Sequence, residues 1–208
     1  MNKALLKTEV SAIFAPLPAI AGGWACIHAD PPWCFKSNSL ARPGRNAARH
    51  YACLSLSDIA SLPVKDAAAR DSFVFLWVTG PFLAIGAHVP IMTAWGFEPT
   101  AMAFVWTKTR ANGELFVGSG LTTRKSCEFV VIGKRGKPRR LAADVREAIL
   151  EPLREHSRKP SEIYERIERY CGGPRLDLFA RESRAGWTVW GDQTTKFDQE
   201  SAPAMPAE

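Results

Sequence analysis

Two long apolar runs constrain the fold more than any other feature of this sequence. Residues 24–29 (WACIHA) and residues 72–79 (SFVFLWVT) contain no Asp, Glu, Lys or Arg. A strand that is apolar along its whole length, and not only at every second residue, is typical of the centre of a sheet that is covered on both faces. The two runs therefore favour an α/β fold built on a buried sheet.

The rest of the chain alternates between shorter strand patterns and helical patterns. Residues 160–170 (PSEIYERIERY) predict a helix that ends at Gly172 and Gly173, and residues 81–95 predict another, which Pro90 kinks or shortens. Further strands are expected at residues 100–107, 127–133, 175–179 and 187–190. Strands separated by helices predict a mainly parallel sheet with helices on both faces.

The chain is long enough for one domain with a substantial core, which we expect to span residues 1–197 of the 208. Residues 198–208 are rich in Ala, Pro and Glu and predict a disordered tail.

No apolar run reaches the length of a membrane span. Basic residues precede an apolar stretch at residues 10–21, as in a signal peptide, but two prolines interrupt that stretch. We therefore expect a cytoplasmic protein that does not contact a membrane.

The charge and the metal-binding residue types narrow the function classes. Lys and Arg total 27 against 21 Asp and Glu, which gives a formal net charge of +6. An excess of that size is compatible with a polyanionic partner such as a nucleic acid. The five Cys and four His form no CxxC, HxxxH or HExxH spacing. We therefore expect neither a disulfide framework nor a metal site.

Basic residues concentrate in three stretches between the expected elements. If the three stretches line one rim of the sheet, their cations would follow a phosphate backbone. The alternative for each stretch is a solvated surface loop, and for residues 134–140 (KRGKPRR) the two readings are about equal. The candidate nucleic-acid contacts are Lys36, Arg42, Arg45, Arg49, Arg124, Lys125, Lys134 and Arg135.

The strongest chemical signal is the segment from Asp30 to Trp33, which directly follows the first apolar run and reads DPPW. Pro31 and Pro32 hold φ and remove two backbone donors, so the turn presents carbonyl oxygens without competing N–H groups. Asp30 adds a charged acceptor, and Trp33 adds a stacking surface. Acceptors beside a flat ring suit a planar base that is held by its amino group. The alternative is a rigid turn in which Trp33 belongs to the core.

Asp30 and Arg181 each follow the end of an expected strand. In open parallel sheets, ligands bind in the crevice beyond the carboxyl ends of the strands. We therefore expect these two side chains to face one crevice.

A series of further segments accompanies DPPW in a fixed order. The segments are ADPPW (29–33), HYACLSLSDIASLPV (50–64), FLWVTGPFL (75–83), RKSCEFVVIGKRG (124–136), HSRKPSEIYERIER (156–169), LDLFAR (176–181) and GWTVWGDQ (186–193). Over about residues 24–193 the chain thereby resembles the adenine-N(6) methyltransferases related to the catalytic subunit of the eukaryotic messenger-RNA adenosine methyltransferase. The resemblance is greatest to the short bacterial and phage members of that family.

The resemblance implies a Rossmann-like methyltransferase fold with a permuted motif order, in which the catalytic motif precedes the cofactor-binding strand. It implies Asp30, Pro31, Pro32 and Trp33 as the catalytic residues. Asp30 and the carbonyl of Pro31 would accept hydrogen bonds from the target amine, and Trp33 would flank or stack on the base. In duplex DNA the base would first have to be flipped out of the stack.

The same resemblance implies S-adenosylmethionine as the cofactor. Asp30 would lie beside it, Lys159 would bind its carboxylate and Arg181 would lie near its ribose. Asp192 and Gln193 would lie near its adenosine end. The alternatives are a solvated Lys159 and an Arg181 that forms a salt bridge to cap its strand.

The sequence departs from the family pattern at two acidic positions. Asp177 stands where the family commonly has Glu, and we expect it to be a structural or supporting acid. Asp192 stands where the family commonly has Asn, so it accepts hydrogen bonds but lacks the amide donor.

The leading functional hypothesis is an adenine-N(6) methyltransferase that acts on DNA. The same reaction on RNA is the close alternative, because loop charge does not distinguish the two nucleic acids. A catalytically inactive, nucleic-acid-binding partner subunit is the alternative from another class, and the intact DPPW argues against it. A cytosine-amine methyltransferase is disfavoured, because those enzymes usually carry Ser where this chain has Asp30. A homodimer and a complex with a partner subunit are both compatible with the sequence.

Overall fold

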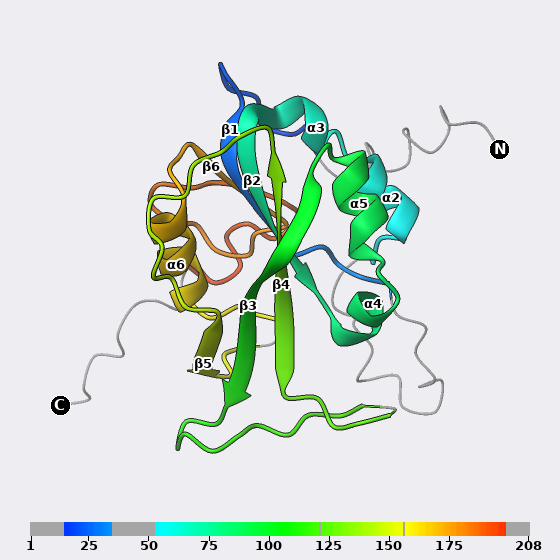
Figure 1. Ribbon diagram of the computed structural model, residues 1–208. Helices are drawn as coiled ribbons and strands as arrows, with labels where there is room; N and C mark the ends of the chain where they lie inside the picture. Colours follow the sequence, from blue (N-terminus) through cyan, green and yellow to red (C-terminus); the bar gives the residue numbers. More distant parts are fainter. Residues whose placement is uncertain (1–14, 35–52, 121, 156, 199–208) are drawn as a thin grey trace.

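The computed structural model describes residues 15–34, 53–120, 122–155 and 157–198, which form one seven-stranded sheet in the order β5-β3-β4-β2-β1-β6-β7. The strands are β1 (Trp24–Ala29), β2 (Ala68–Val78), β3 (Glu98–Thr109), β4 (Cys127–Arg135), β5 (Ala148–Pro152), β6 (Arg175–Leu178) and β7 (Thr188–Trp190). The helices are α2 (Leu56–Ser61), α3 (Val64–Ala67), α4 (Gly80–Ala84), α5 (His88–Ala94) and α6 (Glu162–Tyr170) (Figure 1).

The direction of β4 decides which residues meet at each edge of the sheet. The pairs β1–β2, β1–β6, β3–β5 and β6–β7 are parallel, whereas β4 is antiparallel to both β2 and β3. The prediction of a mainly parallel sheet is therefore confirmed. Because β4 is reversed, Phe129 near its start pairs with Val78 at the end of β2, and Arg135 at its end pairs with Ser72 near the start of β2.

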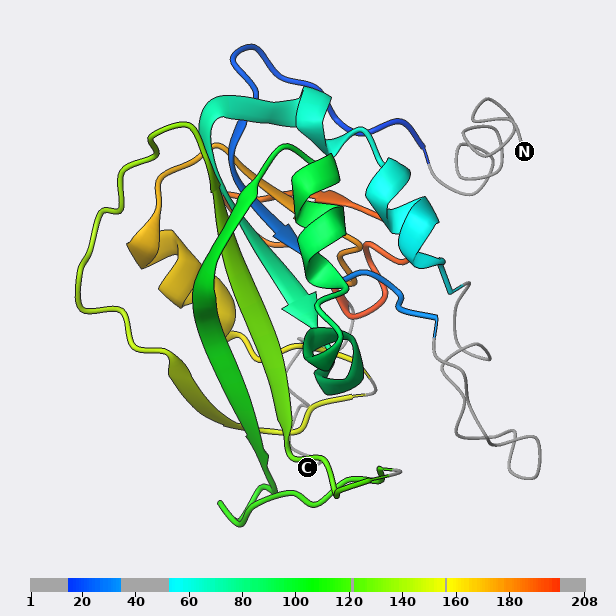
Figure 2. The ribbon, with the colours of Figure 1, turned by 45° about the vertical axis from the view of Figure 1, so that its right-hand side comes forward.

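Helices cover both faces of the sheet, as predicted. Helices α2, α3, α4 and α5 lie on one face and α6 lies on the other (Figures 1 and 2). The first face carries an apolar core that includes Ile27, Leu76 and Trp95. The second face carries a separate core in which Ile163 and Ile167 of α6 pack against the sheet. Among the described residues, every helix is too short or too polar to cross a lipid bilayer.

Helix α2 begins with a capping box that fixes the chain beside the DPPW turn. The Ser55 hydroxyl accepts a hydrogen bond from the Asp58 amide at 3.1 Å, and the Asp58 carboxylate accepts one from the Ser55 amide at 3.1 Å. Such reciprocal caps satisfy two of the free amides of a helix N-terminus. The preceding residue, Leu54, donates its amide to the carbonyl of Pro32 at 2.9 Å. The start of α2 is thus hydrogen-bonded to the turn that follows β1.

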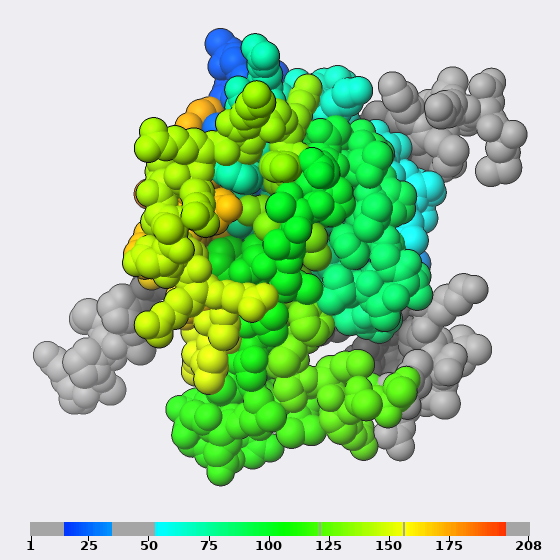
Figure 3. All heavy atoms as spheres, in the orientation of Figure 1, coloured from blue at the N-terminus to red at the C-terminus, as the bar shows by residue number. Residues whose placement is uncertain are grey.

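The connection between β3 and β4 projects beyond the sheet. In the space-filling view it forms a ridge at the lower end of the molecule (Figure 3). It folds back antiparallel on the end of β3, where Leu115 pairs with Thr109 and the Phe116 amide donates to the carbonyl of Lys108 at 2.9 Å. Leu115 and Val117 on it are about half exposed, at 53% and 54%.

Several elements differ from the sequence-based expectation, which did not include helices α2 and α3. The helix predicted at residues 81–95 is two helices, and the break lies at Gly86, with φ +67°, and not at Pro90. Pro90 falls in the first turn of α5, where no intrahelical amide donor is needed. Helix α6 begins after Ser161, so Pro160 precedes it. Strand β5 was not predicted, because it lies at the sheet edge with an exposed Leu150 and lacks a continuous apolar run.

Asp198 is the first residue of the predicted tail and the last residue that the structure describes. Asp198 is part of the fold, because its carboxylate accepts hydrogen bonds from the amide and the hydroxyl of Ser183, each at 2.7 Å. The rest of the predicted tail lies outside the described residues, and the extent of the domain over residues 1–197 stays a prediction.

Candidate active site

Asp30 lies at the carboxyl edge of the sheet, directly after the central strand β1. Its amide donates to the carbonyl of Leu178 at 3.2 Å, so the residue continues the pairing of β1 with β6. Its carboxylate is 17% exposed and is therefore accessible from the edge. The expected position of Asp30 beyond the end of a buried strand is confirmed.

Lys159, in the connection from β5 to α6, lies beside Asp30. Its ammonium is 3.0 Å from Oδ2 of Asp30 and 2.9 Å from Oε2 of Glu128. It also lies 4.9 Å from the centre of the Trp77 ring, within the range of a cation–π contact. The alternative of a solvated Lys159 is wrong, because the side chain is only 12% exposed and is bound on two sides.

Glu128 extends this cluster and was not among the predicted site residues. Its second oxygen, Oε1, accepts a hydrogen bond from Nζ of Lys108 at 2.5 Å. The four side chains therefore alternate in charge, in the order Asp30, Lys159, Glu128 and Lys108. The reversed direction of β4 brings Glu128 to this edge, and local sequence patterns do not report strand direction. The signal available in the sequence was an acid at the start of a strand whose other end is basic.

The cluster holds Glu128 and Lys159 in their charged forms. Burial raises the pKa of Glu128, but the ammonium groups of Lys159 and Lys108 outweigh it and lower that pKa to about 2. Burial lowers the pKa of Lys159, but the carboxylates of Asp30 and Glu128 outweigh it and raise that pKa above its ordinary value. At neutral pH, Lys159 is therefore a fixed cation between two carboxylates.

In the DPPW turn, one backbone carbonyl already has a hydrogen-bond partner within the turn. The carbonyl of Pro31 accepts a hydrogen bond from the Trp33 amide at 2.9 Å. A carbonyl oxygen has two lone pairs, so that of Pro31 can still accept a second donor. The expectation that the prolines leave this carbonyl without a competing donor is wrong, because the donor comes from the residue after them.

Trp33 lies in the core and is not displayed on the surface. It is 3% exposed, its ring stacks on Phe82 with centroids 5.0 Å apart, and its indole N–H donates to the carbonyl of Trp77 at 3.1 Å. These contacts match the alternative reading, in which Trp33 belongs to the core. The stacking of Trp33 on a base stays a prediction.

A buried hydrogen-bond network supports the floor of the site. His28 Nδ1 lies 2.7 Å from Oδ1 of Asp177, and the Tyr164 hydroxyl donates to Oδ2 of Asp177 at 2.8 Å. The Trp77 indole N–H donates to His28 Nε2 at 2.8 Å, which places the His28 proton on Nδ1. Asp177 is therefore the supporting acid that was expected, and the network orients the Trp77 ring beneath Lys159.

A narrow pocket brings three predicted residues together. Asp30, Lys159 and Arg181 line it, and the connections that follow β5 and β6 form its walls. The expectation that Asp30 and Arg181 face one crevice is confirmed. Asp192 is exposed and Gln193 is half-buried, and neither lines this pocket. The two stand in the short connection after β7, where Oε1 of Gln193 accepts a hydrogen bond from Nζ of Lys196 at 3.3 Å.

The predicted nucleic-acid contacts divide into three groups. Arg124 and Lys125 are exposed and precede β4, at the same edge of the sheet as Asp30. Lys134 and Arg135 lie at the opposite edge, where Arg135 donates to the carbonyl of Lys65 at 2.6 Å. The expectation that all three stretches line one rim is wrong for the third, because β4 is antiparallel. The contacts predicted in the first basic stretch lie outside the described residues, and they are Lys36, Arg42, Arg45 and Arg49.

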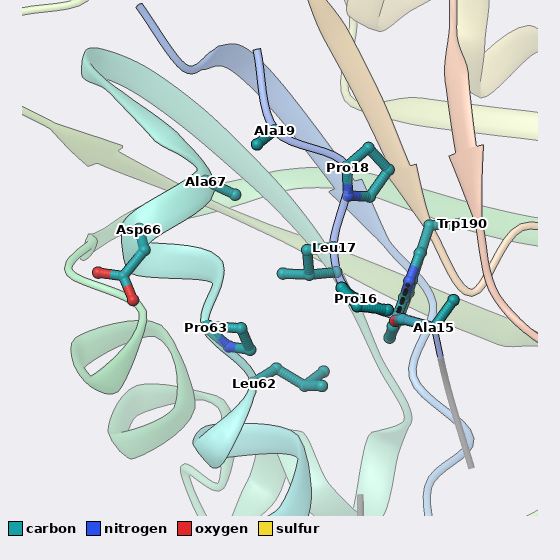
Figure 4. A pocket seen from close by; sticks show the side chains of 10 residues that line it. All are labelled: Ala15, Pro16, Leu17, Pro18, Ala19, Leu62, Pro63, Asp66, Ala67 and Trp190. Atoms are coloured by element: carbon teal, nitrogen blue, oxygen red, sulfur yellow. Dashed lines mark hydrogen bonds between the residues drawn. The ribbon is translucent and has the colours of Figure 1, made fainter. Parts of the chain in front are cut away.

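A larger pocket, about 360 Å³ in volume, lies elsewhere and is lined mainly by apolar residues (Figure 4). Residues 15–19, Leu62, Pro63 and Trp190 form most of its wall, and Asp66 is the one titratable residue that lines it. The indole N–H of Trp190 donates to the carbonyl of Ala15 at 2.8 Å, which holds the N-terminal segment in place. A reactive site needs several convergent polar groups, and those lie in the narrow pocket around Asp30. Within the described ranges, no three His, Cys, Asp or Glu side chains are placed to hold a metal ion.

Comparison with known proteins identifies the family that the chain matches. The family model described as MT-A70 matches residues 24–193. The chain is 30% identical over 209 residues to the Type II methyltransferase M.MunI of Mycoplasma sp, covering 91% of this chain and 86% of that protein. It is 32% identical over 177 residues to the N6-methyladenosine RNA methyltransferase MTA1 of Cryphonectria parasitica, covering 82% and 51%.

A third relative is the N(6)-adenosine-methyltransferase subunit METTL3 of Danio rerio, 30% identical over 186 residues, with 84% of this chain and 29% of that protein covered. The chain thus spans most of the first relative, about half of the second and less than a third of the third.

Proposed function

The chain belongs to the MT-A70 family of methyltransferases, and from that membership we propose that it transfers a methyl group from S-adenosylmethionine to the exocyclic N(6) amine of adenine in DNA. The observation that carries the proposal is the pair of Asp30 and Lys159. Their charged groups meet 3.0 Å apart at the carboxyl edge of the sheet. Asp30 directly follows β1 and Lys159 lies in the connection from β5 to α6, so only the folded chain brings them together.

The donor set of the narrow pocket fits S-adenosylmethionine. That cofactor carries a sulfonium and an ammonium cation, a carboxylate, a ribose and a purine, so it needs charges of both signs and an apolar surface. The pocket offers the Asp30 carboxylate, the cations of Lys159 and Arg181, and the rings of Phe179 and Phe197. We assign Asp30, Lys159 and Arg181 to the cofactor, with Asp192 and Gln193 at its adenosine end. The bound cofactor supplies an electrophilic methyl group.

The protein contributes position and charge. In the proposed reaction, Asp30 and the carbonyl of Pro31 accept hydrogen bonds from the adenine amine and so direct its lone pair. Lys159 binds Oδ2 of Asp30, which fixes the orientation of the carboxylate. Most of the rate acceleration then comes from alignment and from charges that are already in place before the reaction.

We propose DNA as the substrate on the basis of the alignment with the Type II methyltransferase M.MunI, which covers 91% of this chain and 86% of that protein. The relatives whose names specify RNA or adenosine are longer, and the chain spans about half or less of them. Arg124 and Lys125 lie at the same edge as Asp30 and are the described candidates for backbone contact. RNA is the second candidate, because the relative MTA1 is named as an RNA methyltransferase.

The proposal is tested by mass spectrometry of nucleosides from host DNA and RNA after expression of the protein. We expect N(6)-methyladenine to rise in the DNA pool with the wild type and not with Asp30→Asn. Asp144→Asn is the matched control, because that carboxylate is 75% exposed in a surface ion pair. A rise in the RNA pool alone would assign the substrate to RNA. S-adenosylmethionine binding without methylation of either pool would favour the inactive partner subunit.

A further inference from the structure

A buried ion pair ties together the two loops that carry the proposed cofactor residues. Arg158 precedes Lys159 in the connection from β5 to α6, and Glu182 follows Arg181 in the connection from β6 to β7. Oε2 of Glu182 accepts hydrogen bonds from Nε of Arg158 at 3.0 Å and from Nη2 at 2.6 Å. The two side chains are 7% and 14% exposed, so solvent screens this pair much less than a surface pair.

The same guanidinium reaches two further segments. Its Nη1 donates to the carboxylate of Glu155 at 3.2 Å, and this contact lies within the connection from β5 to α6. Its central carbon lies 5.0 Å from the centre of the Phe197 ring, a cation–π contact. The Phe197 amide in turn donates to the carbonyl of Arg181 at 3.0 Å. Arg158 therefore joins both walls of the pocket to the C-terminal part of the fold.

Both loops contain a residue in a strained backbone conformation. Ser157 has φ +65° and Phe179 has φ +64°, in the left-handed region that residues other than glycine rarely adopt. Such conformations are unfavourable for these residue types and persist only where the surrounding contacts enforce them. Ser157 directly precedes Arg158, and Phe179 lies two residues before Arg181. Contacts from other residues must therefore hold the two loops in this conformation.

We propose that Arg158, through its buried ion pair with Glu182, is a positioning residue that sets the affinity for S-adenosylmethionine by holding Lys159 and Arg181 in place. The inference rests on the proposed function, because it assigns the cofactor to this pocket. Removing either partner breaks the ion pair between the two loops, and Arg158 then keeps Glu155 of its own loop, or Glu182 keeps Arg184, as an ion-pair partner. Glu182 would then turn toward Arg184, whose Nη2 already lies 3.4 Å from its Oε1, and the tie to the Lys159 loop would be lost.

The test measures S-adenosylmethionine binding by isothermal titration calorimetry, together with the melting temperature of each variant. We expect Arg158→Gln and Glu182→Gln each to raise the Kd about tenfold, a loss of about 1.4 kcal/mol. The double variant should be no weaker than the singles, because both remove one interaction. Arg169→Gln is the control, because Arg169 forms an ion pair with Asp144 that is 59% and 75% exposed, and its Kd should equal that of the wild type.

The outcomes separate this inference from the proposed function. No binding by the wild type would overturn both. If the wild type binds and both variants bind equally well, whatever their melting temperatures, the ion pair is only structural and the inference fails. If Arg158→Gln weakens binding while Glu182→Gln does not, Arg158 contacts the cofactor directly and the positioning role is wrong. Should Arg158→Gln fail to fold, the isosteric Glu182→Gln still decides.

Discussion

Replacing Glu128 with Gln removes the central negative charge of the cluster at the candidate active site. The carboxylate lies between Lys159 at 2.9 Å and Lys108 at 2.5 Å. Gln has nearly the same shape, so the change tests the charge and leaves the packing almost unaltered. We expect the variant to be less stable at neutral pH and to respond differently to acid.

The size of the effect follows from the pKa of Glu128. That pKa is lowered from its ordinary value of 4.5 to about 2, chiefly by Lys159 and Lys108 acting against the effect of burial. A depressed carboxyl pKa stabilises the folded state above the unfolded pKa, and the contribution is lost as the pH falls through the folded pKa. The charge therefore contributes about 3 kcal/mol at pH 7. Roughly 1.4 kcal/mol of this is lost by pH 3.5, and most of the rest by about pH 2.

The measurement is urea unfolding of the wild type and Glu128→Gln at pH 7 and at pH 3.5. Other carboxyl groups titrate in both proteins, so the informative quantity is the difference in unfolding free energy between them. That difference should shrink by about 1.4 kcal/mol between the two pH values. Glu114→Gln is the matched control, because its ion pair with Arg110 is 60% and 65% exposed, and it should change stability little at either pH.

Two results would refute this reasoning. One is a Glu128→Gln variant as stable as the wild type at pH 7, which would mean that burial cancels the attraction of the two lysines. The other is a stability difference that stays constant or grows as the pH falls, which would show that Glu128 is already protonated in the folded protein.

Three further predictions concern other parts of the site and fold. Lys159→Met should lower methyl transfer from labelled S-adenosylmethionine by at least about 100-fold, because Asp30 loses the cation that orients it. Trp33→Ala should lower the free energy of unfolding by about 3–5 kcal/mol, and Trp33→Phe by only about 1 kcal/mol, since Phe loses chiefly the hydrogen bond to Trp77. Gly136→Ala should lower the melting temperature by several degrees, because Gly136 has φ +65° and a Cβ there would collide with Asp71. Equal melting temperatures would contradict that last prediction.

The sequence alone was sufficient for the centre of the sheet and for the position of Asp30 at its edge. Strand β1 has the predicted bounds, because an unbroken apolar run needs cover on both faces. The position of Asp30 at the carboxyl edge followed from that strand and from the parallel arrangement of its neighbours. Arg181 reached the same pocket for the same reason. These features depend on local patterns and on a general rule for parallel sheets.

Only the tertiary structure decided the rest of the site. Glu128 and Lys108 come from strands whose relative direction no local pattern reports, and the reversal of β4 brings Glu128 to Lys159 and takes Lys134 and Arg135 to the opposite edge. Trp33 packs against Phe82, a contact between residues far apart in sequence. Local periodicity determines which face of an element is buried, whereas charges separated by many residues are paired only by the path of the folded chain. The alternating charges around Asp30 are therefore a property of the fold.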